Sequence, residues 1–455
     1  MRTKLPQPNA DIIAAIATAQ GCGGIGVVRI SGGNLDALIR GTLGKSICER
    51  HATYTNFLDK NGDTLDKGIA LFYPAPHSYT GEQVLELQGH GGPVVLQLLL
   101  RRCLDLGARL AQPGEFTYRA FLNGKLDLAQ AESVADLIEA NTVEAARSAL
   151  RSLRGEFSTA IHCLVDELIH LRMLVEATLD FPEEEVDSVD LETRLDLLNT
   201  IRSHLQHTLN TAKQGSLLRE GAHVAIAGQP NVGKSSLLNR LAGEDLALVS
   251  DIPGTTRDVI RQAIQIRGVP LHIMDTAGLR KSEDVVENMG IERAHQALHK
   301  ADLILLLIDA REGLTTIDRA ILASLPADIP RLLVFNKTDL ADGIAGISSG
   351  ASLEGVPHLM ISAKTGSGID LLRNKILEFI GWKDQANGCF AARERHLRAL
   401  ALANNHLAQA QDVLESQELF AEELRLAQIA LNEITGEFTA NDLLGEIFKR
   451  FCLGK

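Results

Sequence analysis

A glycine-rich stretch of the sequence has the residue types that bind a chain of phosphates. Residues 228–235 read Gly-Gln-Pro-Asn-Val-Gly-Lys-Ser, which fits the P-loop pattern. An apolar run precedes them and a helix is predicted from about Lys234, so backbone N–H groups should surround the phosphates at a helix N-terminus. Lys234 should contact the β and γ oxygens, and the Ser235 hydroxyl should ligate Mg²⁺. The predicted phosphate-binding residues are Asn231, Val232, Gly233, Lys234, Ser235 and Ser236.

Two further motifs predict that the bound base is guanine. Asn336-Lys337-Thr338-Asp339 ends a predicted strand, and Ser362-Ala363-Lys364 follows another. The carboxylate of Asp339 can accept from the N1–H and the exocyclic amine of guanine, whereas adenine offers no such pair of donors. The second motif completes the base pocket. Because these motifs stand in order at the ends of predicted strands, we expect GTP binding.

The remaining nucleotide-binding motif, Asp-x-x-Gly, is followed by an unusual residue. Asp275-Thr276-Ala277-Gly278 comes 41 residues after Lys234, and its carboxylate can hold the Mg²⁺ shell while its glycine N–H senses the γ-phosphate. In Ras-type switches the next residue is a glutamine that orients the attacking water, but here it is Leu279. Either hydrolysis is slow and needs another protein, or a monovalent cation held by Asn231 and oxygens of residues 250–258 replaces an arginine finger.

The predicted secondary structure changes in type along the chain. Residues 1–120 mix predicted strands, glycine-rich turns and a helix, which indicates an α/β domain. Residues 121–215 have helical apolar spacing, and 216–382 alternate strands with helices, as in a mostly parallel sheet covered on both faces. Residues 383–455 are again helical. We expect the two helical segments to pack together with a Ras-like P-loop domain inserted between them; separate adjacent bundles are the alternative.

Composition and charge narrow the class of protein. The net charge of −13 argues against nonspecific coating of nucleic acid. It is distributed as +2 over residues 1–120 (12 basic, 10 acidic), −9 over 121–215 (8 basic, 17 acidic) and −6 over the remaining 240 residues. Six scattered cysteines without a Cys-x-x-Cys pair make a zinc site or a disulfide framework unexpected. No apolar run is long enough for a membrane span and no signal-type segment opens the chain, so we predict no membrane association and a cytoplasmic location.

Several blocks resemble one family along the whole chain. They include residues 255–258 (Thr-Thr-Arg-Asp), 275–280 (Asp-Thr-Ala-Gly-Leu-Arg), 290–293 (Gly-Ile-Glu-Arg) and the tail 451–455 (Phe-Cys-Leu-Gly-Lys). In the N-terminal part they include residues 24–32, 79–82, 86–92 and 113–127. Together these blocks closely resemble the MnmE (TrmE) family of bacterial tRNA-modification GTPases.

The resemblance implies a mechanism of GTP hydrolysis. Family members form homodimers whose G domains meet across their nucleotide faces in a potassium-dependent way. It further implies that Glu287 positions the attacking water through a second water. The implied K⁺ ligands are Asn231, Thr255 and the backbone of Ser250 and Ile252, the implied Mg²⁺ ligands are Ser235 and Thr256, and Ser250, Thr255 and Thr256 join the GTP-binding residues.

The resemblance also implies a wider reaction. With an MnmG-type FAD/NADH flavoprotein, the family adds an aminomethyl or carboxymethylaminomethyl group to C5 of the wobble uridine (U34) of certain tRNAs. The one-carbon unit comes from a tetrahydrofolate derivative, 5-formyl or 5,10-methylene. An N-terminal folate-binding and dimerisation domain is implied, with Arg29, Glu86, Lys125 and the terminal Lys455 holding the folate. Cys452 matches a cysteine proposed to assist the chemistry.

Some features leave other interpretations open. Where the family usually has Ala-Thr-Pro-Pro-Gly followed by a basic residue, this chain has Ala-Thr-Ala-Gln-Gly-Cys at 17–22, which bears on folate affinity. The N-terminal domain could then be a dimerisation scaffold that binds no folate. An Era- or Der-like ribosome-assembly GTPase is the other alternative, although no second P-loop and no C-terminal Gly-x-x-Gly RNA-binding loop appear.

Overall fold

The computed structural model describes residues 11–180, 191–243, 260–275, 299–341, 352–383 and 388–436. Contacts divide the chain into two compact units. The first comprises residues 1–135, 152–201 and 402–455, and the second comprises residues 136–151 and 202–401.

The first unit contains a six-stranded sheet in the order β3-β4-β5-β2-β1-β6. Its pairings are antiparallel except for β1 with β6. Helices α1 and α2 share one apolar core with the sheet, in which Phe57, Leu85 and Leu99 are fully or almost fully buried. The elements are β1 (Ile13–Ile16), β2 (Gly23–Gly32), α1 (Asp36–Leu43), β3 (Thr53–Leu58), β4 (Thr64–Tyr73), β5 (Gln83–Gly91), α2 (Pro93–Asp105) and β6 (Arg109–Leu110).

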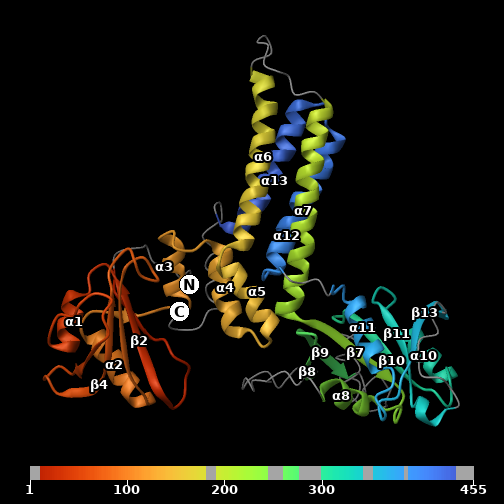
Figure 1. Ribbon diagram of the computed structural model, residues 1–455, viewed down its shortest axis with the longest axis horizontal. Helices are drawn as coiled ribbons and strands as arrows, with labels where there is room; N and C mark the ends of the chain where they lie inside the picture. The colour runs from red at the N-terminus through yellow and green to blue at the C-terminus, as the bar shows by residue number, and fades with distance from the viewer. Residues whose placement is uncertain are drawn as a thin grey trace, which may run out of the picture. The chain divides into compact units, whose positions relative to one another are not determined.

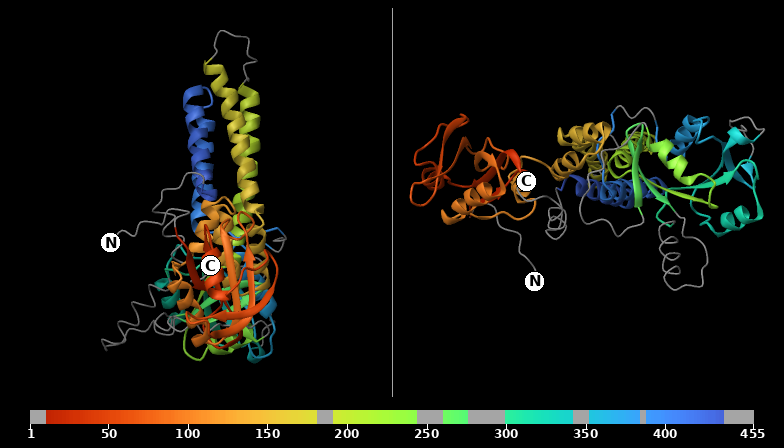
Figure 2. Two further views of the ribbon diagram at one scale, coloured as in Figure 1. Left: turned by 90° about the vertical axis from the view of Figure 1, so that its left-hand side faces the viewer. Right: turned by 90° about the horizontal axis from the view of Figure 1, so that it is seen from below.

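Helices dominate the chain between and after the sheets. They are α3 (Glu115–Leu122), α4 (Leu128–Glu139), α5 (Val143–Leu153), α6 (Glu156–Asp180), α7 (Leu191–Glu220), α12 (Glu394–Asp412) and α13 (Gln417–Thr435). Although α6 and α13 are far apart in the sequence, they lie side by side (Figures 1 and 2), and Arg172 Nη1 donates to Gln428 Oε1 across them at 2.9 Å. Helical segments from both sides of the second sheet therefore pack on each other, as the sequence predicts.

The second unit contains a seven-stranded sheet in the order β12-β13-β11-β10-β7-β9-β8. Strands β13, β11, β10, β7 and β9 are parallel, and β12 and β8 run antiparallel to their neighbours. The elements are β7 (Ala222–Gly228), α8 (Lys234–Ala242), β8 (Ile260–Ile266), β9 (Val269–Asp275), β10 (Leu303–Asp309), α10 (Thr316–Ser324), β11 (Arg331–Asn336), the 3₁₀ turn η1 (Thr338–Leu340), β12 (Ser352–Leu353), β13 (Val356–Met360) and α11 (Ile369–Phe379).

The central strand β10 shows why this sheet is covered on both faces. Leu303, Leu305 and Leu307 pack into one core with residues of α8 and α11. Ile304, Leu306 and Ile308 pack into a second core with Leu322 of α10. Successive side chains of a strand point to opposite faces, so a continuous apolar run requires two covering layers. The predicted fold class is confirmed: the chain contains an N-terminal α/β domain, a helical domain and a Ras-like domain with a mostly parallel sheet.

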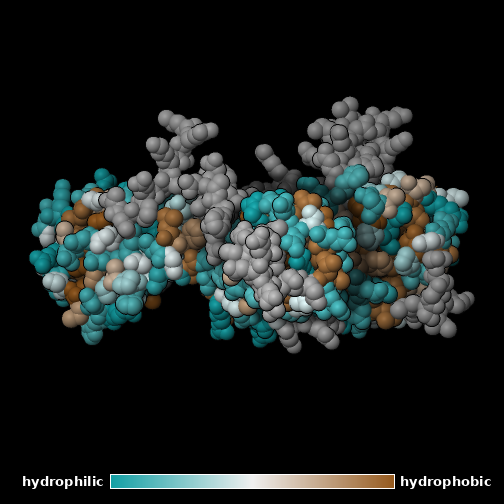
Figure 3. Space-filling model, turned by 90° about the horizontal axis from the view of Figure 1, so that it is seen from above, coloured by the Kyte–Doolittle hydropathy of each residue, from teal (hydrophilic) through white to brown (hydrophobic). Residues whose placement is uncertain are grey.

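The surface of the protein mixes hydrophobic and hydrophilic residues. On the face drawn in Figure 3, hydrophobic side chains are interspersed with hydrophilic ones. Among the helices of the described residues, none combines the length and the apolar content needed to cross a bilayer.

Candidate nucleotide site

The loop between β7 and α8 is closed against the ends of two neighbouring strands. A Cβ atom on Gly228, whose φ is +142°, would lie 2.4 Å from the carbonyl oxygen of Leu307 in β10. A Cβ atom on Gly233, whose φ is +102°, would lie 2.3 Å from Nδ2 of Asn336. Glycine is needed at both positions because a side chain would collide there and because L residues rarely adopt these angles. The loop is therefore the tight backbone cradle that the sequence predicts.

The lysine and the serines of this loop occupy the N-terminal turn of α8. Lys234 Nζ donates to the carbonyl oxygens of Gly228 at 2.7 Å and of Gln229 at 2.9 Å, so the ammonium group lies over the loop. Ser235 and Ser236 are exposed in the first turn of the helix. The predicted lysine and hydroxyl are thus brought together at a helix N-terminus, where an anion is favoured.

Asn336 joins three loops that are far apart in the sequence. Its side chain is 2% exposed, its Nδ2 donates to Val232 O at 2.9 Å, and its Oδ1 accepts from Ala363 N at 2.9 Å. One buried side-chain amide therefore connects the phosphate loop, the end of β11 and the segment after β13. The sequence predicts each of these motifs, and the structure brings them together at the carboxyl ends of β7, β11 and β13.

The predicted base pocket has a defined hydrogen-bond arrangement. Asp339 is exposed, and its Oδ1 accepts from Ser362 Oγ at 2.6 Å. Ser362 Oγ in turn accepts from the backbone N–H of Thr365 at 3.1 Å. Ala363 is buried and Lys364 is exposed. A carboxylate anchored at one oxygen and open to solvent suits two adjacent N–H donors such as those of guanine.

A carboxylate that sequence reasoning did not assign completes this edge. Lys337, at φ +68°, donates through Nζ to Asn231 O at 2.6 Å and to Asp309 Oδ2 at 2.9 Å. Hydrogen bonds from Arg311 and then from Lys337 hold the pKa of Asp309 well below its ordinary value, although burial opposes this. Asp309 ends the most apolar run of the chain, and a charged residue at the carboxyl end of a buried strand is the signal that could have identified it.

A second missed contact fixes the loop to α10. Gln229 Nε2 donates to Thr315 Oγ1 and to Asp318 Oδ1, each at 3.0 Å. Thr315 and Asp318 form a capping box at the start of α10, and Asp318 is 1% exposed. The pattern Thr-x-x-Asp is readable from the sequence as a helix start, but nothing in the sequence pairs it with Gln229.

Several predicted residues lie outside the described part of the chain. Asp275 ends β9, and only its backbone position is described. The residues outside are Ser250, Ile252, Thr255, Thr256, Thr276, Ala277, Gly278, Glu287, Cys452 and Lys455.

In the first unit the structure pairs two of the residues predicted to hold folate. Arg29 and Glu86 face each other across β2 and β5, and Arg29 Nε donates to Glu86 Oε1 at 2.9 Å. The Arg29 guanidinium also lies 5.6 Å from the ring centre of Tyr79 and 5.9 Å from that of Phe116. Lys125 is exposed, and its side chain lies close to Gly81.

A buried network of ion pairs and hydrogen bonds joins residues of three of the sequence blocks. Arg119, from the block at 113–127, donates to Glu82 Oε2 at 3.0 Å and to Glu115 Oε1 at 3.1 Å, and all three side chains are at most 3% exposed. Ser31 Oγ also donates to Glu82 Oε2 at 2.7 Å. Burial alone raises the pKa of Glu115, but hydrogen bonds from Arg109 and from the Gln112 backbone outweigh it and lower this pKa. Removing one of these charges would leave another buried without its partner, so such a substitution would destabilise the N-terminal domain.

The fold and the site define a P-loop domain built for a guanine nucleotide. Two family models match the chain: "MnmE helical domain" over residues 128–452 and "GTP-binding protein TrmE N-terminus" over residues 12–125. The chain belongs to the MnmE (TrmE) family of tRNA modification GTPases. The prediction of this family, and with it of a GTPase, is confirmed.

Relatives named "tRNA modification GTPase MnmE" match over nearly their full length. The one from Chromobacterium violaceum is 59% identical over 444 residues, which cover 97% of this chain and 98% of the relative. Those from Nitrosospira multiformis and Nitrosomonas europaea are each 58% identical, covering 98% of this chain and 99% of the relative. Full-length matches of this kind disfavour the Era- or Der-like alternative.

Proposed function

We propose that this chain is a potassium-stimulated GTP hydrolase that acts in tRNA modification. With an MnmG-type FAD/NADH flavoprotein it adds an aminomethyl or carboxymethylaminomethyl group to C5 of U34, using a one-carbon unit of tetrahydrofolate. The observation that carries the GTP part is the junction at Asn336, which sets the phosphate loop and the base-binding segments at one edge of the sheet. The tRNA part rests on the family and on full-length relatives.

Residues of this chain bind GTP and position it for hydrolysis. Lys234 and the backbone of the loop bind the phosphates, and Asp339 selects the base. Ser235 and Thr256 would hold Mg²⁺, and Asn231, Ser250, Ile252 and Thr255 would hold K⁺; these cations neutralise charge on the phosphates when bound. Ser235 is the proposed Mg²⁺ ligand that the structure describes, and its exposed hydroxyl in the first turn of α8 is the type of oxygen ligand that P-loop sites use. Glu287 would position the attacking water.

The folate part rests on the pair at Arg29. A guanidinium and a carboxylate beside two aromatic rings offer hydrogen bonds and flat apolar faces to a fused-ring ligand, which supports this site. Lys125 and Lys455 would bind its anionic part, and Cys452 would assist the chemistry.

The proposed organisation follows the sequence boundaries. Residues 1–120 form the folate-binding and dimerisation domain, 121–215 and 383–455 the helical domain, and 216–382 the inserted G domain. The partners are a second copy of this chain, the flavoprotein and tRNA, and the proposed location is the cytoplasm.

Loss of the chain in cells should remove the modified base. Mass analysis of tRNA nucleosides from cells lacking this protein should show unmodified uridine at position 34 of the affected tRNAs. Re-expression of the chain should restore the modification. Re-expression of Lys234→Ala should not, because the phosphates lose the ammonium group that contacts them. An unchanged nucleoside profile in the deletion strain would refute the tRNA role.

Substitution of Arg29 should weaken folate binding. Isothermal calorimetry with 5-formyl-tetrahydrofolate should give an affinity at least about tenfold lower for Arg29→Ala, since a charge-assisted hydrogen bond is lost. Lys67→Ala is a matched control, because Lys67 also lies over an aromatic ring of the same sheet, 4.9 Å from the centre of Tyr54. Absence of binding heat with the unchanged protein would support the scaffold interpretation instead.

A further inference from the structure

The hairpin of β8 and β9 connects the nucleotide edge of the second sheet with its opposite edge. Strand β9 pairs in parallel with the phosphate-loop strand β7, from Ala222 with Leu271 to Ile226 with Asp275. Asp275 therefore lies beside the strand end that leads into the phosphate loop. The turn of the hairpin, Arg267 and Gly268, lies at the other end, and both residues have positive φ, +49° and +80°. Because the two strands are hydrogen-bonded along their length, a displacement at one end of the hairpin would displace the other end as well.

The turn rests directly on helix α5. A Cβ atom built on Gly268 would lie 2.3 Å from Oε2, 2.5 Å from Cδ and 2.6 Å from Cγ of Glu144, which belongs to the first turn of α5. No side chain fits between the turn and this helix, so backbone and Glu144 are in direct contact. On its other side the turn is held by Arg267 Nη2, which donates to Asn374 Oδ1 of α11 at 2.7 Å.

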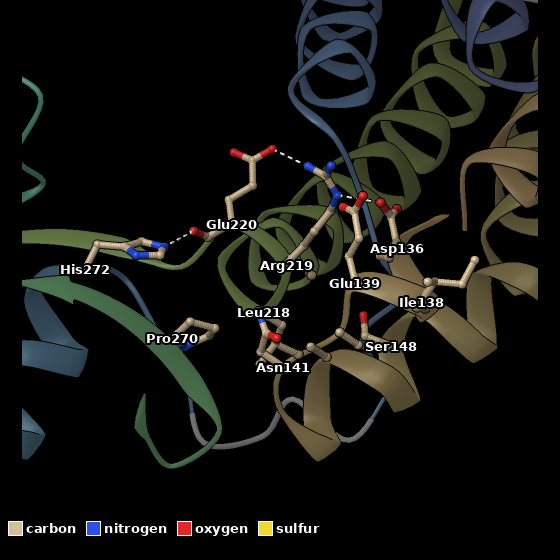
Figure 4. A pocket seen from close by; sticks show the side chains of 15 residues that line it. Asp136, Ile138, Glu139, Asn141, Ser148, Leu218, Arg219, Glu220, Pro270 and His272 are labelled. Carbon is tan, nitrogen blue, oxygen red and sulfur yellow. Dashed lines mark hydrogen bonds and ion pairs between the residues drawn. The ribbon is translucent and has the colours of Figure 1, made fainter. Parts of the chain in front are cut away.

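A buried carboxylate fixes the base of the sheet to the same pair of helices. Asp136 of α4 is 7% exposed, and its Oδ1 accepts from Arg219 Nε and from Arg393 Nη2, each at 2.7 Å. Arg219 precedes β7 by three positions and Arg393 immediately precedes α12, so both connections between the sheet and the long helices meet at Asp136 (Figure 4 shows its bond to Arg219). We call these three residues the Asp136 clamp.

Between the clamp and the turn the packing is open. A cavity of about 670 Å³ is bounded by Pro270 and His272 of β9 on one side and by Asn141 and Ser148 of the helical side on the other (Figure 4). Ser148 is 3% exposed, and its Oγ has no hydrogen-bond partner among the described residues. Because close-packed interiors resist deformation and a cavity does not, β9 has room to shift against α4 and α5 here.

We propose that the β8–β9 hairpin carries the nucleotide state to helix α5 through the contact of Gly268 with Glu144. The Asp136 clamp keeps the base of the sheet fixed, so that movement at the Asp275 end appears as movement of the turn. Glu144 and Gly268 act as positioning residues, because Gly268 lies in the turn at the end of the hairpin opposite Asp275 and Glu144 lies in the first turn of α5. The inference rests on the proposed function only in that the sheet must bind GTP.

Hydrogen exchange of the full chain tests this path. With Mg²⁺, K⁺ and a non-hydrolysable GTP analogue, amide exchange across residues 143–153 should change about fivefold or more relative to the nucleotide-free protein. In Gly268→Ala most of that nucleotide-dependent difference should disappear, while a fluorescent GTP analogue binds with unchanged affinity. Glu144→Ala, which removes the contacted side chain without straining the turn, should have the same effect and covers the case in which Gly268→Ala does not fold.

Gly355→Ala is a matched control in the same sheet. Glu354 and Gly355 form the turn between β12 and β13 with φ of +53° and +79°, but nothing lies within 4 Å of a Cβ atom on Gly355. Gly355→Ala therefore introduces the same backbone strain as Gly268→Ala but no steric collision. It should leave the nucleotide-dependent change in amide exchange of α5 intact. The proposal is overturned if amide exchange in α5 does not respond to bound nucleotide in the unchanged protein, or if Gly268→Ala and the control Gly355→Ala give the same response. Absence of nucleotide binding by the unchanged protein would instead refute the GTP site itself.

Discussion

Asp339→Asn should change the nucleotide preference of this protein from GTP to xanthosine triphosphate (XTP). The variant should bind GTP about a thousandfold more weakly, because an amide N–H₂ then faces the exocyclic amine of guanine and a charge-assisted pair is lost. Xanthine carries a carbonyl oxygen in place of that amine, so the same amide donates to it. Competition of unlabelled nucleotides against a fluorescent GTP or XTP analogue measures both affinities.

The hydrogen bonds around Asp339 decide which way the new amide points. Ser362 Oγ accepts from Thr365 N at 3.1 Å and directs its own proton to Asp339 Oδ1 at 2.6 Å. In the variant the amide oxygen takes the place of Oδ1, and the N–H₂ group faces the base. Ser362→Ala in addition to Asp339→Asn should therefore reduce the gain in XTP affinity.

A second aspartate of the same sheet provides the control. Asp302 is exposed at the opposite edge, where its Oδ2 accepts from His223 N at 2.7 Å. Asp302→Asn should leave both nucleotide affinities unchanged. If Asp339→Asn keeps the discrimination of the unchanged protein, the assignment of the base pocket is wrong.

Replacement of KCl by NaCl should lower GTP turnover at least about tenfold, because an ion that takes the place of an arginine finger contributes strongly to the rate. The proposed K⁺ ligand that the structure describes is Asn231. Its side chain is exposed, and its backbone oxygen already accepts from Lys337 Nζ at 2.6 Å. We therefore propose the side-chain oxygen as the atom of this residue that would ligate K⁺. Steady-state phosphate release in the two salts at equal ionic strength measures the effect.

Two substitutions of Asn231 separate the cation from the loop conformation. Asn231 has φ of +62°, which glycine adopts without strain. Asn231→Gly should therefore keep the loop and GTP binding but lose most of the potassium response, whereas Asn231→Asp retains a side-chain oxygen and should retain the response. Equal turnover of the unchanged protein in both salts would leave the other interpretation, slow hydrolysis that needs another protein.

Local patterns along the chain were enough to predict the nucleotide motifs and the type of each layer. Gly228 to Ser235, Asn336 to Asp339 and Ser362 to Lys364 are contiguous, and the apolar run at β10 reveals a strand buried on both faces without knowledge of its neighbours. The strand that precedes Ser362 is β13, Val356–Met360, and its ends follow its pairing, since residues 356 and 357 pair with β12 and residues 358–360 with β11.

Contacts between distant residues were decided only in the tertiary structure. Asn336 with Val232 and Ala363, Lys337 with Asp309, and Asp136 with Arg219 and Arg393 each join residues that no spacing rule connects. The physical reason is that a buried polar group needs a partner, but strand order and helix packing determine which partner is within reach. Contiguous motifs in the sequence therefore predict the chemistry of the site, and the arrangement of strands and helices sets which side chains hold those motifs in place.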